Sequence, residues 1–198
     1  MKRFSTILLA CALPAAHFDI LIQDARVIDG SGNPWFRADV AIQSGRIAAI
    51  GNLKGDTANR IIPARGRVLT PGFIDVHTHV ESTVELVPRG DNYLLDGVTS
   101  IVTGNCGGSR VDLSAWFSQL EETGLGLNLA TLIGHNSVRG EGMGTANRPA
   151  TADEIQQMRE LIDRAMRDGA VGFSTGLIYI PGTYSNTEEV VALARAAA

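Results

Sequence analysis

Apolar and polar residues alternate along the first third of the chain, in short runs separated by turn residues. Runs of this kind are FDILIQ (18–23), ARVID (25–29), ADVAIQ (38–43), RIAAIG (46–51) and RVLT (67–70). Alternation with a period of two is typical of strands that bury one face, whereas the mostly polar stretch LKGDTANR (53–60) predicts a loop. Residues 17–70 are therefore expected to form a small β-sandwich-like domain.

From Pro71 onward the pattern changes to apolar runs that alternate with amphipathic helical segments. Strands are predicted near 72–77, 98–103, 127–133 and 170–175. Strands that alternate with helices indicate a parallel α/β arrangement. The helices carry start and stop signals, which are Pro88 with Gly97, Thr151 and Glu154 with Gly169, and Asn186 with Glu189.

Four βα units make up half of a (β/α)8 barrel, and the sequence ends within the fourth helix. Half a barrel leaves an edge strand unpaired and one side of its core open. We therefore expect residues 71–198 to be the first four units of a TIM-type barrel, in an N-terminal fragment of a longer protein. A complete small α/β protein with an open sheet is the alternative.

Two of the four histidines lie one residue apart, at the end of the apolar run in PGFIDVHTHVES (71–82). Residues i and i+2 of a strand project to the same face, so His77 and His79 are expected to point the same way. The carboxyl ends of barrel strands form the mouth of the active site, where two imidazoles would bind one metal ion. The alternative is a pair of hydrogen-bonded surface histidines, although a buried strand has little reason to end in two polar rings.

A third candidate ligand follows the second predicted strand, in TSIVTGNCGG (99–108). The glycines around Cys106 allow a turn tight enough to aim its short side chain at the barrel axis. A lone cysteine usually serves as apolar packing, but next to a His-x-His pair its sulfur is a suitable zinc ligand. The sequence therefore predicts a metal site made of His77, His79 and Cys106.

Composition indicates which kinds of partner are not expected. The 198 residues have a net charge of −4, and 44% of them are hydrophobic and 19% charged, which is typical of a globular domain. Only two lysines occur, Lys2 and Lys54. A nucleic-acid-binding surface is therefore not expected.

Residues 1–16 place positive charge before a short apolar run, in the order typical of a secretory signal. The run is too short to span a membrane. Cleavage after Ala12 and lipid attachment at Cys11 are both compatible with it, and removal would leave Cys106 as the sole cysteine, without a disulfide partner. We expect a periplasmic or secreted protein. The alternative is an irregular apolar N-terminus on a cytoplasmic protein.

Four stretches together resemble a known family. PGFIDVHTH is similar to the first-strand metal motif of the amidohydrolase superfamily, whose members join a small β-domain to a metal-bearing (β/α)8 barrel. TSIVTGNCG, IGHNSVRG and GAVGFSTGLIYIPGTYSNTEE resemble the N-acyl-D-amino-acid deacylases, also called D-aminoacylases. The resemblance covers residues 18–198, roughly the first two-fifths of a family member.

The resemblance implies zinc-dependent hydrolysis of the amide bond of N-acyl-D-amino acids, which gives a D-amino acid and a carboxylate. It implies that Cys106 helps to hold a tight zinc ion, with His77 and His79 in a neighbouring and often weaker position, so that one or two ions are bound. The fourth predicted strand, AVGFSTGL, has no lysine, in agreement with a family that uses cysteine where many relatives use a carboxylated lysine. Two more histidines and the aspartate that acts as general base are expected beyond the chain end.

Four further residues lie in loops at the expected mouth. His135 is a candidate for contacting substrate, and a role as hydrogen-bonded loop organiser is an equal alternative. Arg139 would pair with a carboxylate or, as we favour, fix the long loop through Pro149 by a salt bridge. Tyr179 and Tyr184 are candidates for donating a hydrogen bond to the substrate's carboxylate or to the developing oxyanion. Tyr179 is slightly favoured over Tyr184, and aromatic packing is the alternative for both.

Two other interpretations stay open at this stage. One is another amidohydrolase that opens cyclic amides or cleaves dipeptides, against which Cys106 and the tyrosine-bearing loop argue. The other is a barrel that has lost catalysis. The expected partner is a small N-acyl-D-amino acid, whose side chain the sequence does not predict, and the oligomeric state is equally open.

Overall fold

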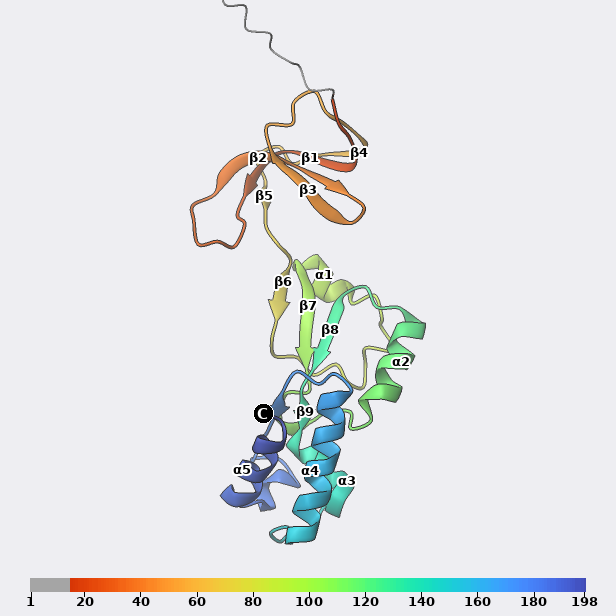
Figure 1. Ribbon diagram of the computed structural model, residues 1–198, viewed down its shortest axis with the longest axis vertical. Coiled ribbons are helices and arrows are strands. Elements are labelled where there is room, and N and C mark those ends of the chain that lie inside the picture. Colours follow the sequence, from red (N-terminus) through yellow and green to blue (C-terminus); the bar gives the residue numbers. More distant parts are fainter. Residues whose placement is uncertain (1–14) are drawn as a thin grey trace, which may run out of the picture. The chain divides into compact units, whose positions relative to one another are not determined.

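A computed structural model describes residues 15–198 of the protein (Figure 1). Most of the predicted leader, including Cys11, lies outside the described residues. The chain divides into two compact units, of which the first ends at Pro71 and the second begins at Gly72, next to the boundary expected at residue 70. Within residues 15–198, no helix is both long enough and apolar enough to cross a bilayer.

The first unit is a five-stranded sheet. Its strands are β1 (His17–Val27), β2 (Phe36–Gln43), β3 (Arg46–Gly51), β4 (Thr57–Pro63) and β5 (Val68–Leu69). They lie in the order β3-β2-β1-β4, with β5 also paired to β1. The first three strands are antiparallel, and β4 and β5 run parallel to β1. The two runs predicted before residue 30 are one strand, because a bulge between Ile22 and Ala25 interrupts its alternation without ending it.

The loop predicted over LKGDTANR is wrong for its second half. Thr57 begins β4, where it pairs with His17 of β1. This strand lies at the edge of the sheet and most of its residues are exposed. An exposed edge strand does not need the apolar alternation that marks a buried one, so the sequence carried no strand signal here.

The second unit contains parallel strands in chain order. Its strands are β6 (Phe73–Asp75), β7 (Val98–Thr103), β8 (Asn128–Thr131), β9 (Ile133–Gly134) and β10 (Phe173–Ser174). β6, β7 and β8 pair in parallel and point the same way in Figure 1, and β10 pairs in parallel with β9. Each predicted strand region holds at least one of these strands. This succession of βα units is the arrangement of the first half of a (β/α)8 barrel, as expected from the sequence.

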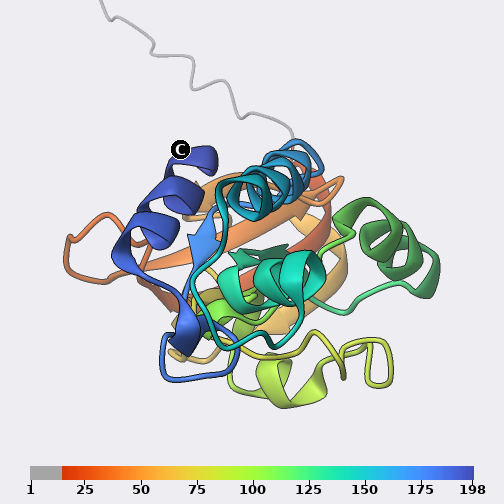
Figure 2. The same ribbon diagram turned by 90° about the horizontal axis from the view of Figure 1, so that it is seen from below.

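Five α-helices and two short 3₁₀ turns lie between these strands or follow the last of them. They are α1 (Asp91–Leu95), η1 (Asn105–Gly107), α2 (Leu113–Thr123), α3 (His135–Met143), α4 (Ala152–Arg167), η2 (Gly182–Tyr184) and α5 (Thr187–Ala196). Helix α4 contacts both α3 and α5 (Figure 2). Apolar side chains of the strands and helices form one core that includes Ile101, Ile133, Trp116, Met158 and Leu193. This core holds the carboxyl ends of the strands in place.

Two of the three helix starts agree with the sequence. Thr151 and Glu154 form the predicted capping box at the start of α4, and the Asn186 side chain accepts a hydrogen bond from the first turn of α5. The prediction that Pro88 begins a helix is wrong. Helix α1 begins at Asp91, and the Pro88 carbonyl accepts a hydrogen bond from Gly126 outside any helix.

Candidate metal centre

The two histidines of the His-x-His motif follow β6 and face the same side. Thr78, which lies between them, is buried, and its backbone N–H and its hydroxyl both donate to the carbonyl of Val102, at 3.1 and 2.9 Å. Because neighbouring residues of an extended chain point in opposite directions, burying Thr78 turns both histidines outward. The rings of His77 and His79 are 5.3 Å apart between centroids.

Cys106 lies in the turn that follows β7, in an uncommon backbone conformation. Its φ and ψ are 55° and 26°, in the left-handed region that residues other than glycine seldom adopt. Two residues earlier, Gly104 has φ 78°, and a Cβ atom there would lie 2.1 Å from the carbonyl oxygen of Leu132. The glycine is therefore required for the close approach of the two strand ends, and the turn aims the thiol back toward the histidines.

The three predicted ligand atoms converge. The Sγ atom of Cys106 lies 3.4 Å from Nε2 of His77, and the ligand atoms of His77, His79 and Cys106 all lie within 4.8 Å of one another. Zinc bonds of about 2.1 Å to nitrogen and 2.3 Å to sulfur allow two donors on one ion to be up to about 4.4 Å apart. The 3.4 Å between His77 and Cys106 therefore fits one shared ion. The limit of 4.8 Å for all three ligand atoms also accommodates two adjacent ions. That the residues bind a metal stays a prediction.

Two polar side chains that the sequence analysis did not single out hold the ligand segments together. The Asn105 amide donates to the carbonyls of Val76 and Thr78, on either side of the first histidine, at 3.4 Å each. The Glu81 carboxylate accepts a hydrogen bond from the backbone N–H of Gly104. Both residues are close to a ligand in the sequence, which is the only signal that could have pointed to them.

His135 and Arg139 lie in a buried polar cluster with Glu189 of α5. None of the three side chains exposes any surface. The Nε2 atom of His135 lies 3.0 Å from one Glu189 oxygen, and Arg139 donates to the other and to the carbonyl of Arg148. The structure thus corrects the prediction that His135 and Arg139 contact substrate. Both serve as organisers instead. Arg139 binds the loop before Pro149 through a hydrogen bond to the Arg148 carbonyl, whereas its salt bridge is to Glu189 of α5 and not to that loop.

Glu189 stays ionised in this cluster. Burial raises the pKa of its carboxyl group, but the hydrogen bonds and charges of His135 and Arg139 lower it by more, so the pKa lies below its usual value of 4.5. The buried carboxylate therefore carries a negative charge that balances the Arg139 guanidinium. The sequence suggested Glu189 only as a capping residue, since its buried partners are far away along the chain.

The two tyrosines are placed differently. Tyr179 is 54% exposed, and its ring lies beside Gly176, where a Cβ atom would meet the ring at 2.9 Å. The same Cβ atom would lie 2.2 Å from the Cys106 carbonyl oxygen, so Tyr179 borders the turn that carries the thiol. Tyr184 ends η2 and is half-buried. The structure therefore leaves Tyr179 available for substrate, and contact of either tyrosine with substrate stays a prediction.

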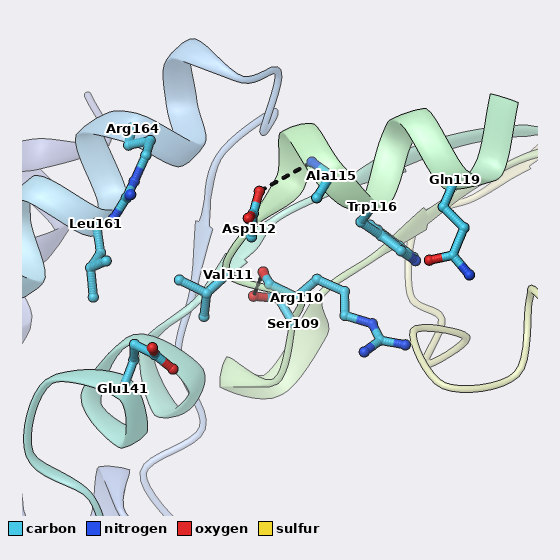
Figure 3. A pocket seen from close by; sticks show the side chains of 10 residues that line it. All are labelled: Ser109, Arg110, Val111, Asp112, Ala115, Trp116, Gln119, Glu141, Leu161 and Arg164. Carbon is cyan, nitrogen blue, oxygen red and sulfur yellow. Dashed lines mark hydrogen bonds between the residues drawn. The ribbon is translucent and has the colours of Figure 1, made fainter. Parts of the chain in front are cut away.

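A cavity of about 540 Å³ opens elsewhere in this unit, between the loop after β7 and the helices α2, α3 and α4 (Figure 3). Its charged lining residues are Arg110, Asp112, Glu141 and Arg164. His77, His79 and Cys106 are not among the residues that line it. The cavity is therefore separate from the candidate metal centre.

Known proteins match this chain over most of its length. The profile described as "Amidohydrolase family" matches residues 60–198. A D-aminoacylase from Alcaligenes xylosoxydans xylosoxydans is 36% identical over 211 residues, which cover 90% of this chain and 42% of the relative.

Solved structures match as well. N-acyl-D-glutamate deacylase from Bordetella bronchiseptica, complexed with zinc and a phosphonate inhibitor, has a TM-score of 0.86 at 35% identity, over 90% of this chain and 42% of that one. A D-aminoacylase studied for the role of its binuclear metal centre has a TM-score of 0.85 at 35% identity, over 90% of this chain and 43% of that one.

The chain spans about two-fifths of the length of these relatives. Within that part, the matched residues include the parallel strands, the turn after β7 and all three candidate ligands. The family profile covers well over half of the chain. This protein therefore belongs to the amidohydrolase family.

Proposed function

We propose that this protein takes part in zinc-dependent hydrolysis of N-acyl-D-amino acids, which yields a D-amino acid and a carboxylate. The convergence of His77, His79 and Cys106 at the carboxyl ends of neighbouring parallel strands carries the proposal. The similarity to D-aminoacylase and to N-acyl-D-glutamate deacylase supports the choice of substrate class. The second relative is named for removing the acyl group of an N-acyl-D-amino acid.

The donor set favours zinc. A thiolate and two imidazoles are soft or borderline ligands that suit zinc, whereas magnesium and calcium prefer oxygen. When bound, zinc in such a site lowers the pKa of a water molecule and polarises a carbonyl group. We propose one or two ions, since the solved relatives include one complexed with zinc and one with a binuclear centre.

The residues of this chain would prepare the site for that ion. The Asp75 carboxylate accepts a hydrogen bond from the backbone N–H of His77 at 3.0 Å, and Asn105 binds the carbonyls around the same histidine. Tyr179 is proposed to donate a hydrogen bond from its phenol to the substrate's carboxylate or to the oxyanion. The resemblance assigns proton transfer to an aspartate at the end of the eighth barrel strand, which none of these 198 residues supplies.

The test is a comparison of variants in a polypeptide that carries the complete barrel. We expect the zinc-loaded protein to release D-amino acids from N-acetyl-D-amino acids and Cys106→Ala to lose both tight zinc and activity. His17→Asn, which alters a histidine of β1 bonded to Thr57 and Asn59, serves as the matched control. Full activity of Cys106→Ala would overturn the assignment. Turnover of cyclic amides or dipeptides alone would overturn it too. So would zinc binding by the parent protein without hydrolysis of any amide.

We also propose that the protein is exported to the periplasm or secreted, with a cytoplasmic location as the alternative. The charge and apolar run of residues 1–16 support export. Sequencing the N-terminus of protein from separated cell fractions tests it. A mature chain that begins near residue 13 supports export, and an intact Met1 in the cytoplasmic fraction contradicts it.

A further inference from the structure

The buried cluster of His135, Arg139 and Glu189 reaches the end of β10 through one exposed residue. The Nδ1 atom of His135 lies 3.0 Å from the hydroxyl oxygen of Thr175, and its Nε2 atom lies 3.0 Å from Glu189. His135 therefore joins a carboxylate of α5 to the residue that follows β10. Such an arrangement anchors the side chain of Thr175 on a buried cluster.

The direction of the hydrogen bond between His135 and Glu189 follows from charge. The ionised Glu189 carboxylate can only accept, so Nε2 of His135 donates to it. The other ring nitrogen, Nδ1, is hydrogen-bonded to the Thr175 hydroxyl, and Arg139 donates to the second oxygen of Glu189. The Thr175 hydroxyl is thus tied to the buried cluster.

The residues on either side of Thr175 hold the turn that carries Cys106. The Ser174 hydroxyl donates to the carbonyl of Gly104 and accepts from the backbone N–H of Gly107, the latter at 3.0 Å. Gly176 lies against the carbonyl of Cys106, so closely that a Cβ atom would be 2.2 Å from that oxygen. The turn is therefore gripped before and after the thiol by a segment whose middle residue is anchored on His135.

This grip matters because Cys106 is held in a strained conformation. A residue with a Cβ atom is strained in the left-handed region, and this conformation persists only when the surroundings enforce it. Loosening the end of β10 would let Cys106 relax toward an ordinary conformation. The Sγ atom would then move away from the position in which it lies 3.4 Å from His77.

We propose that Thr175, anchored by His135 and Glu189, is a positioning residue that keeps the Cys106 thiol aligned with His77 and His79. The inference rests on the proposed metal role of Cys106 and adds residues from β10, α3 and α5 to the site. It assigns the buried cluster a role in metal affinity as well as in folding. Residues outside the ligand shell that orient metal ligands commonly contribute 10- to 100-fold to affinity.

The experiment compares Thr175→Val, which keeps the shape of the side chain but lacks the hydroxyl, with Thr175→Ser, which restores the hydroxyl. Both are made in a Cys11→Ser background, so that Cys106 is the only thiol among these 198 residues. We expect Thr175→Val to weaken zinc binding by about tenfold and to increase the rate of alkylation of Cys106 in the metal-free protein. With cobalt in place of zinc, the sulfur-to-metal charge-transfer band of Thr175→Val should be weaker than that of the parent, or shifted. Thr175→Ser should behave like the parent in all three measurements.

The outcomes separate this inference from the proposed function. If the parent protein shows no sulfur-to-cobalt band and Cys106→Ala binds zinc as tightly as the parent, the metal role of Cys106 fails. If the parent shows the band but Thr175→Val matches it in band, zinc affinity and alkylation rate, the positioning role fails. If Thr175→Val changes only the thermal stability, as a purely structural residue would, the positioning role fails as well.

Discussion

The Nε2 atom of His77 lies 3.4 Å from the Sγ atom of Cys106, although 29 residues separate the two in the sequence. The contact arises because β6 and β7 are neighbouring parallel strands and each ligand follows the carboxyl end of its strand. Parallel strands bring such ends to the same edge of a sheet. The fold therefore supplies a thiol and an imidazole at the distance at which they can share a metal ion.

The histidine ligands can be tested without measuring activity. Replacing a residue that only orients a metal ligand commonly costs at least about tenfold in affinity. We expect His79→Asn, which removes a ligand itself, to lose at least that much zinc affinity. His17→Asn, in the first unit, should retain the parent affinity. Competition with a chromogenic chelator measures both. Equal affinities of the two variants would remove His79 from the site.

Gly104 offers a test of the close approach between the ends of β7 and β8. We expect Gly104→Ala to cost about 1–2 kcal/mol for its positive φ and a further 1–3 kcal/mol for the clash with Leu132. Gly124→Ala is the control, because Gly124 also has a positive φ of 75° but nothing within 4 Å of the added Cβ atom. Urea unfolding followed by circular dichroism gives both values, and equal losses would contradict the steric argument.

The capping box of α4 contributes to the free energy of unfolding by an amount that can be predicted. Thr151 accepts a hydrogen bond from the backbone N–H of Glu154, and Glu154 accepts one from Thr151 in return. We expect Thr151→Ala to lower the free energy of unfolding by about 1 kcal/mol. Thr187→Ala, at the first position of α5 where Asn186 is the cap, should change it little. A larger loss in Thr187→Ala than in Thr151→Ala would contradict the assignment of the caps.

Glu189 makes stability depend on pH in a defined direction. Because its folded-state pKa lies below 4.5, ionised Glu189 stabilises the fold above that pH, and the contribution is lost as the pH falls through the folded-state value. We expect Glu189→Gln to cost about 3 kcal/mol near pH 7, since it leaves Arg139 buried without its partner. The difference from the parent should shrink below pH 4.5.

The exposed neighbour Glu188 provides the matched control for that experiment. Glu188→Gln should change the free energy of unfolding little at either pH, because its side chain lies at the surface. Unfolding in urea at pH 7 and at pH 4 measures all three proteins. A loss in Glu189→Gln that does not change with pH would show that ionisation of Glu189 contributes nothing.

The proposed role of Tyr179 can be resolved kinetically in a polypeptide with the complete barrel. If the phenol donates to the oxyanion, Tyr179→Phe should lower kcat by about 100-fold. If it binds the substrate's carboxylate in the ground state, the change should appear in KM with kcat preserved. Tyr184→Phe is the comparison, and parental kinetics in Tyr179→Phe would exclude both roles.

Local patterns were enough to predict the parallel strands and the candidate ligands. His77 and His79 stand out as two polar rings at the end of an apolar run, and Cys106 stands out among glycines. Periodicity likewise predicted the strands near residues 98 and 170, because they pack against a core. The strand β4 was missed because it is an exposed edge, where burial imposes no apolar pattern.

The environment of His135 could not be predicted in the same way. Its partner Glu189 is 54 residues away along the chain, and nothing near either residue shows that they meet. The sequence allowed His135 and Arg139 to face substrate, and burial excludes that role. Thr175 and Ser174 were also missed, because a serine or threonine at the end of a strand has no distinctive pattern until the neighbouring turn is known.

Sequence alone thus determined the order of strands and helices, the family and the chemical identity of three ligand candidates, since these depend on residue type and on periodicity along the chain. Tertiary structure decided which polar residues at the strand ends are exposed, as His77 and His79 are, and which are buried against a charged partner, as His135 and Arg139 are. The physical reason is that a buried charge is stable only with a partner. Packing of α3 against α4 and of α4 against α5, rather than any local signal, brings Glu189 to His135 and Arg139.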